Sequence, residues 1–318
     1  MREQLPLEQR IFLGRPDPNR DWSDNPLVRQ VGGDPAATWH YGPGGAPHMR
    51  IVGTTGGGKS SLLRLILRGL VRRPGNRAIT VIDAEGAGEF TVFEGMPGVA
   101  QVINVNPAAD RDLPDGQPTS VDRAAQAIAD HLTLSVDRNR DMMQAQAAWL
   151  RLLKDPAHQQ APAYVPDAET FLVIDGWGSL RYDLNRYHRA KLDPVEDAVL
   201  IGRNGRKTDV HLIIADQVMY ASRSKDDDGM PSRLKKQLNC SVAAVGPLGL
   251  TATEASMAFD DPSVRAPAEL GGCLMQVGAT RVGFVVPDWL NATTTDPSVA
   301  IAERRAAYRL LPAPEVVA

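Results

Sequence analysis

The chain has little of what marks disulfide-rich, membrane-spanning or strongly polyanion-binding proteins. Only two of its 318 residues are cysteines, which excludes a disulfide framework, and neither has metal-ligand neighbours. Aromatic residues make up 5% of the chain, and the net charge of −3 gives no overall basic surplus. No apolar run approaches the roughly 18 residues of a membrane span, and the first residues lack the apolar core of a secretory signal. The sequence predicts a cytoplasmic protein, with buried reduced thiols at Cys240 and Cys273, that would reach a membrane only through a membrane-anchored partner protein.

The most informative feature present is a glycine-rich phosphate-binding loop. Gly53 to Ser60 fit the pattern G-x-x-x-x-G-K-[ST], between an apolar strand end and an amphipathic run that begins at Leu62. In such a loop, backbone N–H groups and the start of the following helix bind phosphate oxygens. Lys59 would reach the β- and γ-phosphates, and the Ser60 hydroxyl would be a ligand of Mg²⁺. The residues predicted to bind ATP are Gly53, Thr54, Thr55, Gly56, Gly57, Gly58, Lys59, Ser60 and Ser61.

From residue 47 onward, apolar strand candidates alternate with amphipathic helix candidates. Continuous apolar runs are typical of parallel strands that are covered on both faces. The expected strands are 50–52, 78–83, 102–105, 171–175, 211–215, 240–245, 273–277 and 282–286, and the expected helices are 60–73, 120–153 and 194–207. This alternation predicts an α/β fold, a RecA-like P-loop NTPase with a doubly wound, mostly parallel sheet.

The same pattern predicts three regions. Residues 1–46 are rich in Pro, Gly, Asp and Arg without a sustained period, so we expect an irregular N-terminal arm with one short strand at 37–41. Residues 47–290 form the expected ATPase domain. Residues 291–318 are expected to be a linker and a C-terminal helix, at about 298–311.

A second nucleotide motif ends at Asp175. Phe171 to Ile174 are apolar and Asp175 follows them directly. P-loop enzymes use a carboxylate at the end of a neighbouring strand to hold Mg²⁺. An aspartate at a strand end is common, but downstream of a P-loop it indicates a magnesium ligand, so Ser60 and Asp175 are the predicted metal-binding pair.

These motifs resemble the FtsK/SpoIIIE family of ring-forming ATPases, within the HerA/FtsK superfamily, which pump double-stranded DNA. The resemblance extends over about residues 47–288 and rests on the segments Pro47-His48 with Gly53 to Ser60, Ile82-Asp83 with Glu89 to Pro97, Gly205 to Gln217, and Leu270 to Met275. It implies ATP hydrolysis with Mg²⁺, sequence-independent binding of double-stranded DNA, and a homo-oligomer of six subunits.

One departure from the family pattern concerns catalysis. Members that act on DNA usually have Asp-Glu at the end of the second nucleotide strand, and this glutamate polarises the attacking water. Here the sequence is Asp175-Gly176-Trp177, which is similar to the ATPase modules of type VII secretion systems. Glu85 and Glu89 are the candidates to replace the missing carboxylate. Asp83, at the end of the preceding strand, is either a structural cap or a residue of the site.

The resemblance also suggests roles for residues outside the two motifs. Arg206 would be donated across the ring to a neighbour's γ-phosphate, with Arg203 as the competing candidate, or it would only complement its helix dipole. Gln217 would sense the γ-phosphate by hydrogen bonding. His211 is expected to be a core histidine.

Two groups of basic residues remain. Arg64, Arg68 and Arg72 recur every four residues and predict a solvated helix face. A second basic group around the loop after residue 217 is a candidate for DNA backbone contacts; this group comprises Arg223, Lys225, Arg233, Lys235 and Lys236. Asp226 to Asp228 lie in the same loop and would repel phosphate.

Three functions therefore stay open. The leading prediction is a ring translocase that moves double-stranded DNA in plasmid or mobile-element transfer. The alternatives are an ATPase module of the type VII secretion kind, suggested by Gly176, and a structural ring that binds ATP with little hydrolysis.

Overall fold

We describe a computed structural model of the chain. The described residues are 9–16, 20–31, 33–54, 56–73, 75–86, 88–114, 116–152, 168–188, 192–217, 221–222, 230–245, 249–265 and 272–286. Thr55, Arg223, Lys225 and the expected C-terminal helix at 298–311 lie outside them.

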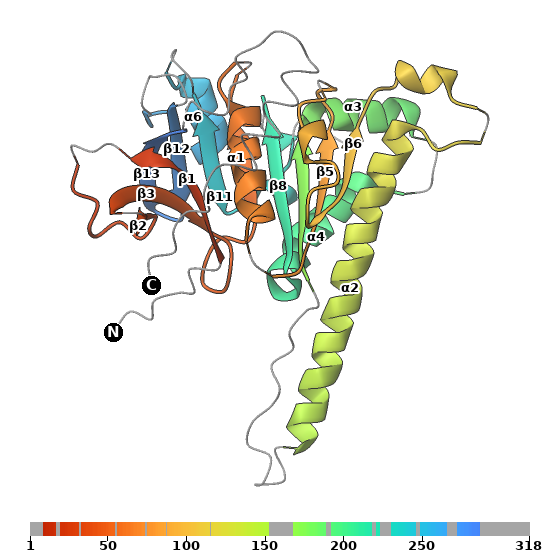
Figure 1. The fold of residues 1–318 in the computed structure, drawn as a ribbon, viewed down its shortest axis with the longest axis horizontal. Helices are drawn as coiled ribbons and strands as arrows, with labels where there is room; N and C mark the ends of the chain where they lie inside the picture. Colours follow the sequence, from red (N-terminus) through yellow and green to blue (C-terminus); the bar gives the residue numbers. More distant parts are fainter. Residues whose placement is uncertain are drawn as a thin grey trace.

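Eleven strands of the described chain form one sheet (Figure 1). Its order is β2-β3-β1-β13-β12-β11-β4-β8-β7-β5-β6. The strands from β11 to β6 are parallel, and those from β12 outward to β2 pair antiparallel. In chain order the strands are β1 Arg10–Pro16, β2 Val28–Val31, β3 Asp34–His40, β4 Met49–Val52, β5 Arg77–Asp83, β6 Val99–Asn104, β7 Glu169–Asp175, β8 Val210–Asp216, β11 Cys240–Ala244, β12 Gly272–Val277 and β13 Thr280–Val285, while β9 Ala221–Ser222 pairs with β10 Met230–Pro231.

Helices cover both faces of the sheet and bury two separate apolar clusters. One cluster joins α1 (Lys59–Val71) to the sheet and to the N-terminal strands. The other lies under the second group of helices, which comprises α2 (Ser120–Leu152), α3 (Trp177–Tyr187), α4 (Pro194–Thr208), α5 (Ser232–Lys235) and α6 (Ala252–Phe259). The C-terminal part of α2 projects beyond the body of the molecule (Figure 1).

The predicted fold is confirmed for the central sheet. Each of the eight strands and three helices expected from apolar periodicity is present, with ends shifted by up to three residues. Parallel strands that are buried on both faces give continuous apolar runs, as in β7 and β8, which explains why they could be recognised. The helices α3 and α6 were not expected.

The expected irregular N-terminal arm is wrong for the described residues. β1, β2 and β3 extend the main sheet, since β1 pairs antiparallel with β13. Ile11, Leu13 and Trp39 are fully buried in the cluster that contains α1. β3 corresponds to the short strand expected at 37–41, with its start three residues earlier. β1 and β2 were missed, because the apolar pattern around them has no sustained period and because β13, one partner of β1, lies at the far end of the described sequence.

The predicted solvated face of α1 is also wrong. Arg64 and Arg68 are buried, with 4% and 8% exposure, and Arg72 is half-buried. Arg64 Nη1 forms an ion pair with Glu89 Oε2 at 2.9 Å and Arg64 Nη2 donates to Ser61 Oγ at 3.1 Å. A four-residue period shows that side chains share one helix face, but it does not show whether another segment covers that face.

Candidate nucleotide-binding site

The P-loop connects the carboxyl end of β4 to the first turn of α1. Gly56 and Gly58 adopt φ of 79° and 95°, a region that favours glycine. At Gly53 and Gly57 a Cβ would lie 2.1 Å and 2.6 Å from the carbonyl oxygen of Ala244, at the end of β11. The glycines therefore allow both the left-handed turns of the loop and its close approach to the neighbouring strand.

Lys59 and Ser60 begin α1 and face the functional end of the sheet. Lys59 is 7% exposed and its Nζ donates to the carbonyl oxygen of Thr54 at 3.3 Å, so the ammonium is held within the loop by the loop's own backbone. The hydroxyl of Ser60 donates to Asp175 Oδ2 at 3.0 Å. The two predicted magnesium ligands, one from α1 and one from β7, thus lie side by side.

Asp83 and Asp175 are paired in register at the ends of the adjacent strands β5 and β7. Both carboxylates are about 1% exposed. Burial raises the pKa of Asp175 to about 7; the Ser60 hydrogen bond and Lys59 oppose this rise, and the charges of Asp83 and Glu85 add to it. Burial also raises the pKa of Asp83. Two buried carboxylates with few cations around them favour either a shared proton or a bound cation.

The residues present fit a magnesium ion. Among the described residues, Asp175 Oδ1 accepts no hydrogen bond although it is buried, so one carboxylate oxygen remains available. No group of three or more His, Cys, Asp or Glu side chains in the described chain could hold a metal. Mg²⁺ is usually held by one or two protein oxygens together with substrate phosphates and water, so Ser60 and Asp175 suffice for it.

Asp216, which sequence reasoning missed as a site residue, ends the strand between β4 and β7. Its Oδ2 accepts from the backbone N–H of Gly178 at 2.7 Å, in the first turn of α3, and its Oδ1 accepts from Gln217 N–H at 2.7 Å. Its carbonyl accepts from Gly53 N–H at 3.2 Å. The signal was present as an acid after an apolar run. The structure shows that this acid ties the P-loop strand to α3.

Glu85 and Glu89, the two candidate replacements for the missing glutamate, have different surroundings. Glu89 is engaged by buried Arg64. Glu85 is exposed and lies against Gly176, where a Cβ would come within 2.9 Å of Glu85 Oε1. Only Glu85 is therefore in contact with the segment that directly follows Asp175.

The structure brings Gln217 to the functional edge of the sheet but not Arg206. Gln217 is half-buried and directly follows β8, between the P-loop strand and the Asp175 strand. Arg206 and Arg203 are exposed near the C-terminal end of α4. Since α4 ends where β8 begins, Arg206 lies near the amino ends of the parallel strands, whereas the P-loop of its own chain lies at their carboxyl ends.

His211 and the two cysteines belong to the core, as expected. His211 is 2% exposed, stacks on Phe171 at 4.7 Å and has its Nδ1 3.1 Å from the carbonyl oxygen of Pro47. Burial lowers its pKa to about 4. Cys240 and Cys273 are free, buried thiols, and burial raises the pKa of Cys273 to about 12.

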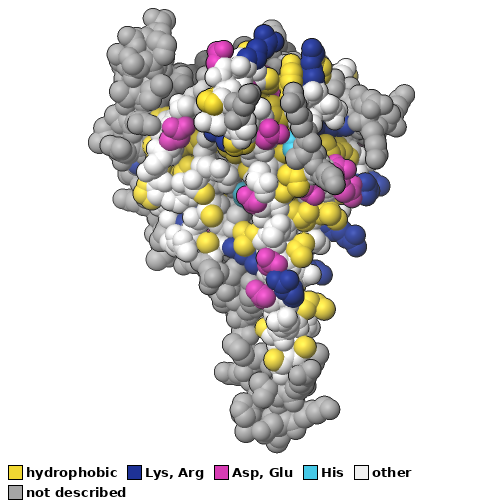
Figure 2. Space-filling view, turned by 90° about the vertical axis from the view of Figure 1, so that its right-hand side faces the viewer, with side chains coloured by type: hydrophobic (Ala, Val, Ile, Leu, Met, Phe, Trp, Pro, Cys, Tyr) yellow, Lys and Arg dark blue, Asp and Glu magenta, His cyan; other side chains and the backbone are white. Residues whose placement is uncertain are grey.

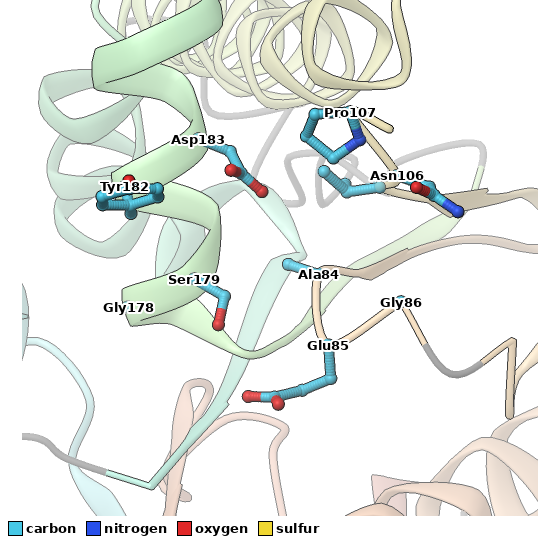
Figure 3. A pocket seen from close by; sticks show the side chains of 10 residues that line it. Ala84, Glu85, Gly86, Asn106, Pro107, Gly178, Ser179, Tyr182 and Asp183 are labelled. Atoms are coloured by element: carbon cyan, nitrogen blue, oxygen red, sulfur yellow. The ribbon is translucent and has the colours of Figure 1, made fainter. Parts of the chain in front are cut away.

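A pocket of about 570 Å³ opens next to the acidic pair (Figure 3). Its walls come from the segments that follow β5 and β6 and from α3, not from the P-loop; the lining residues include Glu85, Asn106, Pro107, Ser179, Tyr182 and Asp183. Glu85 lies at the lower end of the pocket in Figure 3, and its carboxylate extends to the left, below Ser179.

Comparison with known families gives a match to the family described as "Helicase HerA, central domain", over residues 46–208. Among curated proteins, the ESX secretion system protein EccC of Thermomonospora curvata is 28% identical over 211 residues, which cover 64% of this chain and 15% of EccC. The ESX-4 secretion system protein EccC4 of Mycobacterium tuberculosis is 29% identical over 183 residues, 57% of this chain and 13% of EccC4. The chain thus spans a small part of the length of these relatives.

Solved structures share the fold. The cytoplasmic domain of the type VII secretion ATPase EccC of Thermomonospora curvata superimposes with a TM-score of 0.59 and 22% identity, covering 95% of this chain and 33% of that one. The pCW3 conjugation coupling protein TcpA, in a monomer form with ATPγS, gives a TM-score of 0.55 and 18% identity, covering 88% of this chain and 71% of TcpA. These likenesses fit the P-loop NTPase architecture described above.

Proposed function

Since the chain belongs to the family of the HerA helicase central domain, we propose that it is a magnesium-dependent P-loop ATPase module of a secretion machine of the type VII kind. The observation that carries the ATPase part is the hydrogen bond of 3.0 Å between Ser60 and Asp175, beside a P-loop with Lys59 in its first helical position. The similarity to EccC proteins supports the secretion part.

The chain's own residues account for nucleotide binding. The N–H groups of the P-loop and the start of α1 would bind phosphate oxygens, and Lys59 would leave the Thr54 carbonyl to contact them. Ser60 and Asp175 would hold Mg²⁺, which neutralises charge on the β- and γ-phosphates when bound. Asp216 would keep α3 in place against the P-loop strand while Lys59 changes partners, because it accepts hydrogen bonds from Gly178 N–H and Gly53 N–H.

We further propose a homo-oligomer, with six subunits as the resemblance implies. Arg206 is exposed and lies away from its own P-loop, so it can contribute to catalysis only at another subunit's site. A membrane-anchored partner protein would bring the assembly to a membrane, a proposal that the similarity to secretion system proteins supports. No helix in the described part of the chain combines the length and apolar composition needed to cross a membrane.

A protein cargo is favoured over DNA by the state of the basic residues. Arg233 pairs with Glu196 and Lys235 with Asp260, each at 2.6 Å, so among the described basic residues of this group only Lys236 has no ion pair. On the face in Figure 2, Lys and Arg side chains are interspersed with Asp and Glu side chains. DNA binding without sequence preference needs several unneutralised cations along one surface.

Translocation of double-stranded DNA remains the second candidate. It rests on the resemblance of the P-loop and of the Gly205 to Gln217 segment to FtsK-type motors, and the basic residues Arg223 and Lys225 lie outside the described chain.

Phosphate release by the purified chain tests these functions. We expect hydrolysis with Mg²⁺ that Lys59→Ala abolishes, together with co-purification of a membrane-anchored protein encoded beside it. Linear duplex DNA should leave the rate unchanged. A severalfold stimulation by DNA that falls steeply with added salt would overturn the protein-cargo proposal in favour of DNA. Wild-type turnover equal to that of Lys59→Ala would favour a structural ring.

A further inference from the structure

ATP hydrolysis in P-loop enzymes requires a group that orients the attacking water, and the position after Asp175 cannot provide it. That position is Gly176, with φ of 83° and ψ of 59°, and it forms the N-cap of α3. A left-handed conformation is unfavourable for a residue with a side chain. The local backbone therefore favours glycine here, and the water-orienting group has to come from another segment.

The segment after β5 contributes its own side chain to this space. A Cβ on Gly176 would lie 2.9 Å from Glu85 Oε1, 3.0 Å from Glu85 Cγ and 3.2 Å from the Glu85 backbone nitrogen. Glu85 thus packs over Gly176, directly beside Asp175. We propose that Glu85 is the carboxylate that orients and deprotonates the attacking water, a role that rests on the ATPase function proposed above.

The backbone on both sides of Glu85 is fixed to the acidic pair. Ala84 N–H donates to the carbonyl oxygen of Asp175 at 2.9 Å, and Gly86 N–H donates to Asp83 Oδ1 at 3.1 Å. Asp83 is therefore a positioning residue that closes the turn carrying Glu85. Sequence alone left Asp83 as either a structural cap or a residue of the site. Its hydrogen bond to Gly86 N–H is a structural contact, and this contact positions the candidate catalytic residue Glu85.

The carboxylate of Glu85 is free to act, whereas that of Glu89 is not. Within the described chain, the carboxylate of Glu85 forms no ion pair or hydrogen bond. Its negative charge contributes to the raised pKa of Asp175. Glu89 Oε2 is 2.9 Å from the buried guanidinium of Arg64. Glu85 also lines the 570 Å³ pocket, which gives water a route to it.

In the proposed step, the oxygen of a water held by Glu85 forms a bond to the γ-phosphorus. The bond between that phosphorus and the β–γ bridging oxygen breaks, and its electron pair leaves with ADP. The proton lost by the water passes to the Glu85 carboxylate and from there to solvent or to the released phosphate, so no further reactant is needed.

The test compares three glutamine variants in the full chain, with phosphate release and binding of a fluorescent ATP analogue as readouts. Glu85→Gln should lower kcat by roughly 10²- to 10⁴-fold, the usual cost of a lost general base, while the Kd for the nucleotide stays within about twofold. Glu94→Gln, on an exposed glutamate of the same segment, should hydrolyse like wild type. Glu89→Gln should lower the melting temperature, because it removes the ion pair with Arg64. Its kcat should stay close to that of wild type.

The outcomes separate the two proposals. Wild-type turnover with an equally active Glu85→Gln variant would overturn the role of Glu85 and leave the ATPase function standing. A kcat loss confined to Glu89→Gln would assign the role to Glu89 instead. Wild-type turnover no higher than that of Lys59→Ala would overturn the ATPase function, and the role of Glu85 with it.

Discussion

The hydroxyl of Ser60 donates a hydrogen bond to the carboxylate of Asp175, and burial raises the pKa of this carboxylate to about 7. This contact joins the first turn of α1 to the end of β7. Its strength and its readiness to accept Mg²⁺ depend on whether Asp175 carries a proton, so the candidate site is sensitive to pH near neutrality.

We predict that Mg²⁺-dependent ATP binding weakens as pH falls below about 7. A metal ligand must be deprotonated, and each pH unit below the pKa of Asp175 should weaken Mg²⁺-dependent affinity by up to about tenfold. Titration calorimetry between pH 5.5 and 8.5 checks this, with Asp175→Asn as the variant that should lose the dependence.

The same shift has the opposite effect on the protein without ligand. A carboxyl with a raised pKa in the folded state stabilises the fold fully below its unfolded value of 3.8, and this contribution is lost as pH rises through about 7. Asp175→Asn should flatten the dependence of the unfolding free energy on pH between 4 and 8. An unchanged slope in chemical denaturation would contradict the assignment.

Placing a side chain at Gly176 should harm the protein rather than restore a catalytic glutamate. Gly176→Ala introduces a Cβ at φ of 83°, at a cost of about 1–2 kcal/mol, and pushes it against Glu85. Turnover should fall together with the melting temperature. Gly176→Glu should lose turnover in the same way, because its side chain would start from the same left-handed backbone position. A faster Gly176→Glu enzyme would refute our interpretation.

Arg138 should be one of the most sensitive residues for stability. It donates to the carbonyl oxygens of Thr208 at 2.9 Å and Ala168 at 2.7 Å, which connects α2 to the end of α4 and to the segment before β7. Arg138→Ala leaves buried acceptors unsatisfied and should cost about 2–4 kcal/mol. Arg140→Ala, on an exposed pair with Asp137, should cost less than about 1 kcal/mol. Urea denaturation of the two variants measures the difference.

Arg206→Ala should leave ATP binding by a single chain intact, because Arg206 lies near the amino ends of the parallel strands and the P-loop lies at their carboxyl ends. If it acts on a neighbour, adding the variant to wild-type chains should lower the rate more than its mole fraction. A mixing curve that is linear in mole fraction would exclude the arginine from this role and leave it to complement the dipole of α4.

The parts of this fold that could be predicted depend on local signals. The P-loop and the central strands are continuous in sequence, so motif and apolar pattern suffice for them. α3 was missed because Gly176 and Gly178 at its start are typical of a turn, yet Asp216 from another strand caps it. The contact between Glu85 and Gly176 and the burial of Arg64 depend on neighbours from separate segments, which one sequence does not specify.

The pairing of β1 with β13 sets an order for folding during synthesis. Arg15 pairs with Val285, so the first described strand has to wait for the last one before this part of the sheet can close. Non-local pairings of this kind slow folding, because the intervening chain has to be organised first. On the ribosome, β1 to β3 can pair with one another and pack against α1 early, whereas the edge of β1 that faces β13 stays unpaired until β13 emerges. The nascent chain would then be most vulnerable to aggregation, and most dependent on chaperones, just before β13 emerges.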